Sequence, residues 1–264
     1  MTDASATASM PPAADSAGRK LVAVASGKGG VGKTWFAITL AHALASMGQR
    51  ILLFDGDLGL ANVDIQLGLM PKRDLVSVFE GEITMKGALH RHEACGFDIV
   101  AGRSGSGTLA GLSTQRLADL ESELVALAAG YDRVIVDLGA GIDRTIRRMA
   151  GHAGMVLVMT TDEPTALTDA YAFIKVLHGI RPDADIRAVV NLASSGASGE
   201  RTYATLHNAC RKFLKLSPPL AGIVRQDRLV RAAIRAQTPL LVRSPTTDAA
   251  ADVEAIARRL AGVS

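Results

Sequence analysis

The sequence predicts an α/β protein with a doubly wound, mostly parallel sheet and helices on both faces. Short apolar runs alternate along the chain with longer segments of helical spacing. The runs are continuously apolar, which is typical of parallel strands that are covered on both sides. Alternation of such strands with helices favours a layered βα architecture. Ligands of these folds bind at the carboxyl ends of the strands, so polar residues directly after each strand deserve the first attention.

The elements follow one another in a regular order. The first strand is expected at 21–25, and the helix after it at 34–47, where Gly48 ends it. The other strands are expected at 51–54, 97–101, 134–136, 155–159, 186–190 and 220–224. The other helices are expected around the stripe Leu117, Leu120, Leu124 and Leu127, and at 166–177, 203–214, 228–235 and 248–260.

Composition limits the classes of protein that fit. Apolar residues make up 48% of the 264 residues and aromatic residues only 4%, so the core must be aliphatic. The charges are nearly balanced, with 29 basic and 26 acidic side chains, which does not indicate nucleic-acid binding by charge alone. No run approaches the roughly 20 apolar residues of a membrane span. Cys95 and Cys210 are far apart, which excludes a disulfide framework or zinc site and fits a reducing cytosol.

The amino-terminal segment differs from the rest of the chain. Residues 1–19 are rich in Ala, Ser, Thr and Pro and lack the basic and apolar regions of a secretory signal. We expect a disordered tail there, followed by one domain over 20–264.

A glycine-rich loop joins the first strand to the first helix. Residues 27–34, GKGGVGKT, match G-x-x-x-x-G-K-[ST] in the strand–loop–helix context that the motif requires. Glycines let backbone N–H groups surround phosphate oxygens, and the helix N-terminus adds partial positive charge. Lys33 is expected to reach the β- and γ-phosphates, and the Thr34 hydroxyl to bind Mg²⁺. The residues expected around the nucleotide are Gly29, Gly30, Val31, Gly32, Lys33 and Thr34. A glycine-rich turn without a ligand is the alternative.

Acidic residues end two of the predicted strands. Asp55 and Asp57 follow the second strand, and Asp137 follows the apolar run 134–136 in a Walker B pattern. Carboxylates at these positions can hold Mg²⁺ and position water, which is most of what phosphoryl transfer requires. Aspartates at strand ends also serve as turn formers or helix caps, and this alternative stays open for each of them.

The loop resembles that of one particular P-loop class. An early second lysine, Lys28, in the string KGGVGKT is similar to the deviant-Walker ATPases MinD, ParA and the nitrogenase iron protein. The resemblance implies that Lys28 reaches across an ATP-bound homodimer to the partner's nucleotide. It further implies that Asp57 orients the attacking water, that Asp55 and Asp137 support Mg²⁺ beside Thr34, and that Asn191 reads the adenine edge of ATP or ADP. Asp57, Lys28 and Lys33 would then be the residues that act in hydrolysis.

Longer stretches resemble the FlhG/FleN branch of flagellar-number regulators. They are DLGLANVD at 57–64, DLGAGI at 137–142, EPTALTDAYA at 163–172 and the segment from 222 to 239. The resemblance implies a role in flagellar number or placement, with the GTPase FlhF or a flagellar transcription regulator as partner. It also implies a cytoplasmic protein, peripheral to the inner membrane face if it binds lipid.

Three features depart from this branch. Residues 1–20 contain nothing like the DQAxxLR segment by which the branch stimulates FlhF. Leu138 stands where a threonine is usual near the γ-phosphate. Trp35 replaces a small polar residue directly after the phosphate loop; we count it among the nucleotide-binding residues, with packing on the first helix as the alternative.

The carboxyl-terminal helix raises the question of lipid binding. Val253, Ile256 and Leu260 form a narrow apolar stripe beside Arg258 and Arg259. In MinD-like proteins such a helix can bind a membrane surface. An ordinary helix that packs on the sheet gives the same pattern.

The sequence therefore predicts a P-loop ATPase that binds ATP or ADP with Mg²⁺ and forms a homodimer with ATP. DNA is not an expected partner. A ParA-like partition or cargo-positioning ATPase that moves on nonspecific DNA is the first alternative. An iron–sulfur carrier of the same superfamily is the second, and the two distant cysteines argue against it.

Overall fold

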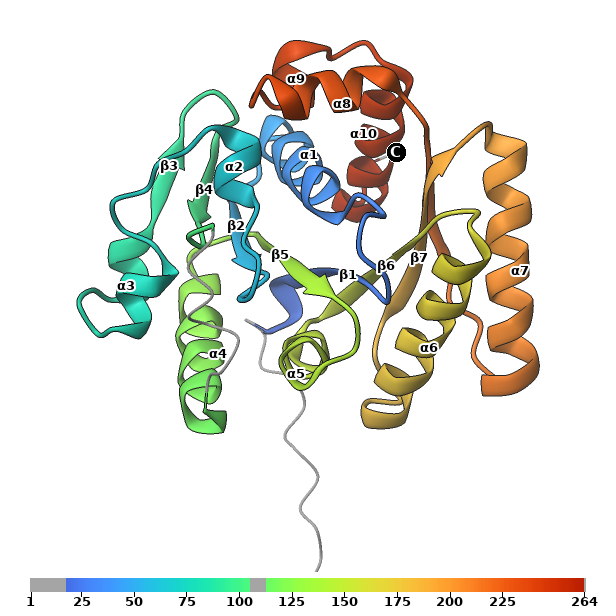
Figure 1. The fold of residues 1–264 in the computed structure, drawn as a ribbon, viewed down its shortest axis with the longest axis horizontal. Coiled ribbons are helices and arrows are strands. Elements are labelled where there is room, and N and C mark those ends of the chain that lie inside the picture. Colours follow the sequence, from blue (N-terminus) through green and yellow to red (C-terminus); the bar gives the residue numbers. More distant parts are fainter. Residues whose placement is uncertain (1–17, 105–112, 264) are drawn as a thin grey trace, which may run out of the picture.

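The computed structural model describes residues 18–104 and 113–263, in which one mixed sheet separates two layers of helices (Figure 1). The strand order is β3-β4-β2-β5-β1-β6-β7-β8, and all neighbouring strands are parallel except β3, which runs antiparallel to β4. The predicted doubly wound α/β fold is confirmed. The strands are β1 Leu21–Ser26, β2 Ile51–Gly56, β3 His90–His92, β4 Phe97–Val100, β5 Arg133–Ala140, β6 Met155–Thr160, β7 Ile186–Ala193 and β8 Leu220–Arg225.

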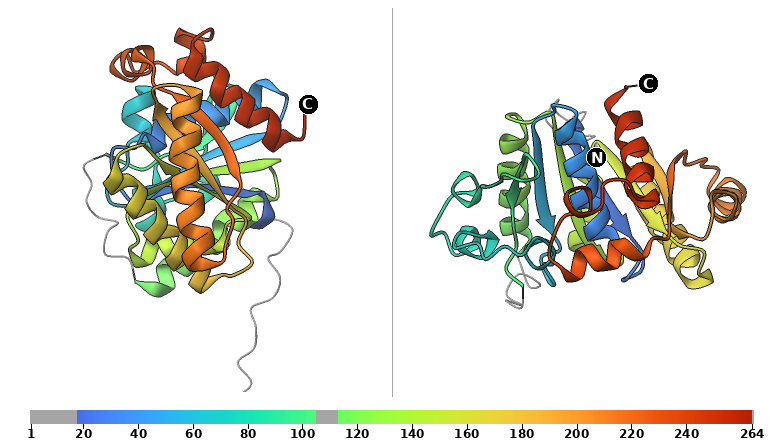
Figure 2. Two further views of the ribbon diagram at one scale, coloured as in Figure 1. Left: turned by 90° about the vertical axis from the view of Figure 1, so that its right-hand side faces the viewer. Right: turned by 90° about the horizontal axis from the view of Figure 1, so that it is seen from above.

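The helices cover both faces of the sheet, as Figure 2 shows from two further directions. One layer holds α1 Lys33–Ser46, α2 Val63–Leu67, α8 Arg228–Arg235, α9 Leu240–Arg243 and α10 Asp248–Ala261. The opposite layer holds α3 Leu75–Phe79, η2 Met85–Ala88, α4 Thr114–Ala128, α5 Arg144–His152, α6 Pro164–Ile180 and α7 Gly196–Leu214. A hydrophobic core lies on each face of the sheet, and alternate residues of β2 belong to different cores. Leu52 and Phe54 lie in one, and Ile51 and Leu53 lie in the other. This explains why the strands are apolar throughout.

Elements that the sequence analysis did not anticipate are short or polar. β3 consists of two histidines and an arginine at the sheet edge, so it offers no apolar run. α5 carries three arginines among its nine residues and buries only Ile146, Met149 and Ala150. Asp143 caps its first turn by accepting a hydrogen bond from the Ile146 N–H. α2 and α3 have five residues each, which is too short for helical periodicity to show.

The predicted tail falls mostly on residues 1–17, outside the described residues, and so does most of the stretch 1–20 in which the FlhF-stimulating motif is absent. Gly18 and Arg19, which we had counted with the tail, belong to the short helix η1, Gly18–Lys20. The backbone of Arg19 lies so close to Gly154 that a side chain at position 154 would collide with it. The domain therefore includes these two residues as well.

The carboxyl-terminal helix is packed against the protein. Val253, Ile256 and Leu260 of α10 are buried against α1 and β8, and α1 and α10 lie side by side when seen from above (Figure 2). The apolar stripe is thus occupied by the protein core and is not a free face for lipid. Within 18–104 and 113–263, none of the helices has the length and apolarity to cross a bilayer.

Candidate nucleotide site

The phosphate loop lies between β1 and α1 at the carboxyl edge of the sheet. Gly30 and Gly32 have positive φ angles of 81° and 92°, which favour glycine. A Cβ on Gly27 would collide with the backbone of Asp169 in α6, and one on Gly32 would lie 2.5 Å from the side-chain nitrogens of Asn191 and Trp35. Close packing on both sides and backbone conformation therefore require glycine at positions 27 and 32.

Lys33 is buried at the base of this loop. Its Nζ donates a hydrogen bond to Ser26 Oγ at 2.9 Å, and Ser26 Oγ in turn donates to the Lys28 carbonyl at 2.6 Å. Burial lowers the pKa of Lys33, while the charges of Asp137 and Asp57 oppose this change. A cation buried in this way gains from an anionic ligand, as the sequence predicts for the β- and γ-phosphates. Ser26, which helps to position both lysines, was missed because nothing in the motif identifies it.

Asp55 and Asp137 stand side by side on the neighbouring strands β2 and β5. Burial, and then the charge of Asp137, raises the pKa of Asp55 well above its ordinary value. Burial also raises the pKa of Asp137 to about 7, although a hydrogen bond from the Thr34 side chain and the charge of Lys33 oppose the rise. Two adjacent buried carboxyls are costly unless positive charge joins them.

These groups suit a magnesium ion. Asp137 Oδ1 is buried and has no hydrogen-bond partner among the described residues. Thr34, Asp55 and Asp137 offer only oxygen atoms, which Mg²⁺ prefers, and Mg²⁺ at nucleotide sites takes one or two carboxylates plus phosphates and water. The described residues contain no group of three or more His, Cys, Asp or Glu arranged to hold a metal by themselves. The protein would thus hold the ion together with the nucleotide.

Asp57, directly after β2, lies against the last residues of β5. Its Oδ1 accepts a hydrogen bond from the Leu60 N–H at 3.0 Å, and it lies so close to Gly139 that a Cβ there would be 3.1 Å from Oδ1. Leu138, the residue that departs from the usual threonine, is buried in the hydrophobic core. Its side chain therefore contributes to packing, and the end of β5 at Gly139 lies next to Asp57 without it.

The Lys28 side chain contacts the start of α6 in the same chain. Its Nζ donates to Glu163 Oε2 at 2.5 Å and to Thr165 Oγ1 at 2.8 Å. The Lys28 and Glu163 side chains are 36% and 62% exposed, so water and salt weaken this pair. Neither acceptor was predicted, although both lie in the stretch 163–172 that resembles the flagellar-number regulators. The two loop lysines thus have different surroundings, one buried and one partly exposed.

Asn191 lies on β7 beside the phosphate loop and is completely buried. Its Nδ2 donates to the Val31 carbonyl at 2.7 Å, while its Oδ1 has no partner within the described part of the chain. Leu192 follows with a positive φ of 58°, at an irregularity in the pairing of β7 with β8. The amide is therefore fixed by the loop and leaves one acceptor unsatisfied, which suits the amino group of adenine.

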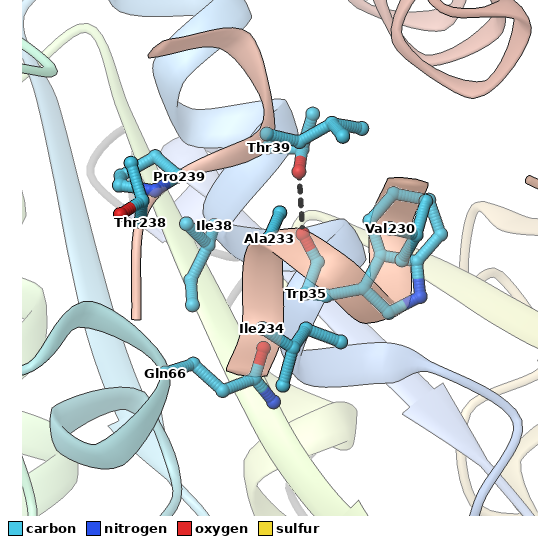
Figure 3. Close-up of a pocket in the computed structure, with 10 residues that line it drawn as sticks. Trp35, Ile38, Thr39, Gln66, Val230, Ala233, Ile234, Thr238 and Pro239 are labelled. Atoms are coloured by element: carbon cyan, nitrogen blue, oxygen red, sulfur yellow. Dashed lines mark hydrogen bonds between the residues drawn. The ribbon is translucent and has the colours of Figure 1, made fainter. Parts of the chain in front are cut away.

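Trp35 is also buried, at 7% exposure, in the first turn of α1. Both alternatives from the sequence have support. Its ring packs among α1 and α8 residues (Figure 3), and its indole nitrogen lies close to Gly32. The structure thus brings together Lys33, Thr34, Trp35, Asp55, Asp57, Asp137 and Asn191 around the loop, and turns Lys28 toward α6.

Comparisons with known proteins agree with this geometry. Residues 22–240 match the family described as the CobQ/CobB/MinD/ParA nucleotide binding domain. The antiactivator FleN of Pseudomonas aeruginosa is 36% identical over 241 residues, which cover 91% of this chain and 86% of that protein. The flagellum site-determining protein YlxH of Helicobacter pylori is 29% identical over 217 residues, covering 82% and 73%.

Solved structures show the same fold. MinD of Pyrococcus horikoshii, complexed with Mg-ADP, aligns with a TM-score of 0.76 at 21% identity, over 91% of this chain and 95% of that one. MinD in the MinC:MinD complex of Aquifex aeolicus aligns with a TM-score of 0.74 at 23% identity, over 93% and 97%. The sequence match, the phosphate loop and the fold together show that the chain belongs to the MinD/ParA family of nucleotide-binding proteins.

Proposed function

We propose that this protein is an ATP-binding and ATP-hydrolysing switch that dimerises with ATP and regulates the number or placement of flagella. The observation that supports it best is the difference between the two loop lysines. Lys33 is buried where it would meet phosphates bound in its own loop, whereas Lys28 is partly exposed and bonded to two exposed or partly exposed groups, Glu163 and Thr165. A partly exposed, long side chain of this kind is free to exchange its partner for phosphates of a second subunit.

Nucleotide binding rests on the phosphate loop, on the buried Lys33 and on the buried Oδ1 atoms of Asn191 and Asp137, which have no partner among the described residues. The backbone N–H groups of the loop and Lys33 would hold the phosphates, and Asn191 Oδ1 would accept from the adenine amino group. Thr34, Asp55 and Asp137 would hold Mg²⁺, whose charge neutralises the phosphate oxygens during transfer. Burial raises the pKa of Asp137 to about 7, so this carboxyl can lose its proton near neutral pH when Mg²⁺ binds.

Hydrolysis needs little beyond positioned water. Asp57 is fixed by the Leu60 N–H and lies against Gly139, near the end of β5. A carboxylate at that place can orient water toward the terminal phosphate. Because Asp57 contacts Gly139, a shift of Asp57 after the terminal phosphate is lost would also move the segment that follows β5.

Dimerisation follows from electrostatics. ATP brings several negative charges to an open edge of the sheet, and a second subunit facing it would add its own Lys28 to those charges. ADP lacks the terminal phosphate, so the gain from the contact is smaller. The dimer would be a two-state element whose equilibrium the nucleotide shifts.

The flagellar role rests on relatives, since FleN is an antiactivator and YlxH a flagellum site-determining protein. Deletion of the gene in its own organism should change the number or position of flagella seen by electron microscopy. A Lys33→Ala allele should reproduce the deletion, whereas Lys212→Ala, on the far helix α7, should not. Normal flagellation in the deletion strain would reject the flagellar role and leave ATP binding to be judged separately.

A ParA-like function on DNA is the second candidate. One observation favours it: Arg228, Arg231 and Arg235 of α8 are all exposed. ATP-dependent binding to nonspecific DNA that weakens steeply with salt would support this candidate. Absence of such binding by the ATP-loaded protein would exclude it.

A further inference from the structure

Trp35, the single tryptophan of the chain, has its polar edge turned toward the phosphate loop. Its Nε1 lies 2.5 Å from the place that a Cβ on Gly32 would occupy, and Asn191 Nδ2 lies equally close to the same place. The indole and the amide are thus neighbours at one side of the loop. They come from α1 and β7, far apart in the sequence.

The opposite side of the ring belongs to the packing between helices. Trp35, Ile38, Val230, Ala233 and Ile234 line a small cavity between α1 and α8, which Figure 3 shows with the indole nitrogen pointing out of the cluster. Trp35 also meets Phe36 edge to face, with ring centroids 6.4 Å apart. Phenylalanine could supply these contacts, so packing alone does not explain the indole N–H.

That N–H donates no hydrogen bond to any of the residues that the structure describes, and it is not among their fully buried unpartnered atoms, so it keeps some contact with solvent beside the loop. Its neighbour Asn191 has the complementary deficit, an amide oxygen that is buried and accepts nothing. One donor, the Trp35 N–H, and one acceptor, Asn191 Oδ1, are therefore available to a ligand beside the loop. A purine base presents both kinds of atom along one edge, whereas phosphates present acceptors only.

We propose that Trp35 is a specificity-determining residue that contacts the purine base and, with Asn191, selects adenine over guanine. Adenine carries an amino group next to a ring-nitrogen acceptor, which matches the Asn191 oxygen and the Trp35 N–H. Guanine carries an oxygen in place of that amino group, and this oxygen would oppose the Asn191 oxygen. The proposal rests on the proposed ATP function and assigns base selection within it.

The test compares ligands with and without a base. Calorimetric titrations with Mg²⁺ would measure the affinities of wild type, Trp35→Phe and Val230→Ala for ATP, GTP and tripolyphosphate. Trp35→Phe keeps an aromatic ring against α8 and removes the N–H, together with the second ring of the indole. It should lose about tenfold in ATP affinity, the size of one hydrogen bond, with little change for GTP or tripolyphosphate. Val230→Ala, which changes the cavity and leaves the N–H in place, should keep the wild-type preference for ATP over GTP.

Fluorescence and melting give independent readouts. Emission from Trp35 should change when ATP binds and stay nearly constant with tripolyphosphate. Equal melting temperatures of apo wild type and Trp35→Phe would show that the fold is intact. An unchanged ATP-to-GTP ratio in Trp35→Phe, or an equal loss of tripolyphosphate affinity, would overturn the role in base selection while ATP binding by wild type stands. A wild type that binds no nucleotide would contradict the proposed function as well.

Discussion

The two ends of the sheet both bury titratable side chains, with different consequences. The carboxyl edge holds a basic group, Lys33, and two acidic groups, Asp55 and Asp137, near glycine-rich backbone. At the amino-terminal end, His42 and His92 surround Phe97, with ring centroids 6.5 and 5.7 Å from it.

Both ends also leave buried atoms without partners in the described structure: Asp137 Oδ1 at one, and the Nδ1 atoms of His42 and His92 at the other. Burial lowers the pKa of both histidines, which keeps them neutral, and no opposite charge contributes to either pKa. An unsatisfied buried atom therefore indicates a ligand site only where charges and a backbone cradle accompany it. Without them it indicates a cost to stability.

The largest effect should follow from removing the buried cation at the carboxyl edge. Lys33→Ala deletes the charge that meets the β- and γ-phosphates, so ATP affinity should fall by about a hundredfold or more. Equilibrium binding of ATP with Mg²⁺ measures it, with Lys212→Ala as the matched control on the surface of α7. Wild-type affinity in Lys33→Ala would show that the carboxyl edge is no more a ligand site than the histidine end.

Asp57→Ala should act on turnover and leave binding intact. The loss of a group that positions water commonly reduces the rate by about a hundredfold. Steady-state phosphate release would measure turnover, and a binding titration would show that ATP affinity is retained. An unchanged rate would remove Asp57 from the mechanism.

The smallest effect belongs to the histidine end and appears as a pH dependence of stability. The folded pKa of His42 is lowered, so the unfolded chain binds more protons, and stability is lost as pH falls from the ordinary value of 6.5 through the folded pKa. Thermal melting of the apo protein between pH 8 and about 5 should show a steeper fall in wild type than in His42→Leu. His178→Leu on α6 is the matched control and should keep the wild-type slope, whereas parallel curves for all three proteins would contradict the assignment.

The same comparison explains how much the sequence could predict. The phosphate loop, Asp137 and most strands are local patterns, so residues 27–34 and the apolar runs were sufficient to place them. The partners of Lys28 were not predictable in this way, because Glu163 and Thr165 lie 135 and 137 residues away and meet it only after folding. His92 sits in a polar edge strand without apolar pattern, and its stacking on Phe97 depends on the β3–β4 pairing.

The central claim is that Lys28 makes the nucleotide control assembly, and light scattering on a hydrolysis-blocked protein tests it most directly. Asp57→Ala should be dimeric with ATP and monomeric with ADP at micromolar concentration. The double variant that carries both Asp57→Ala and Lys28→Ala should stay mostly monomeric with ATP, although it still binds ATP. Dimers in both nucleotides, or none with ATP in Asp57→Ala, would contradict the switch.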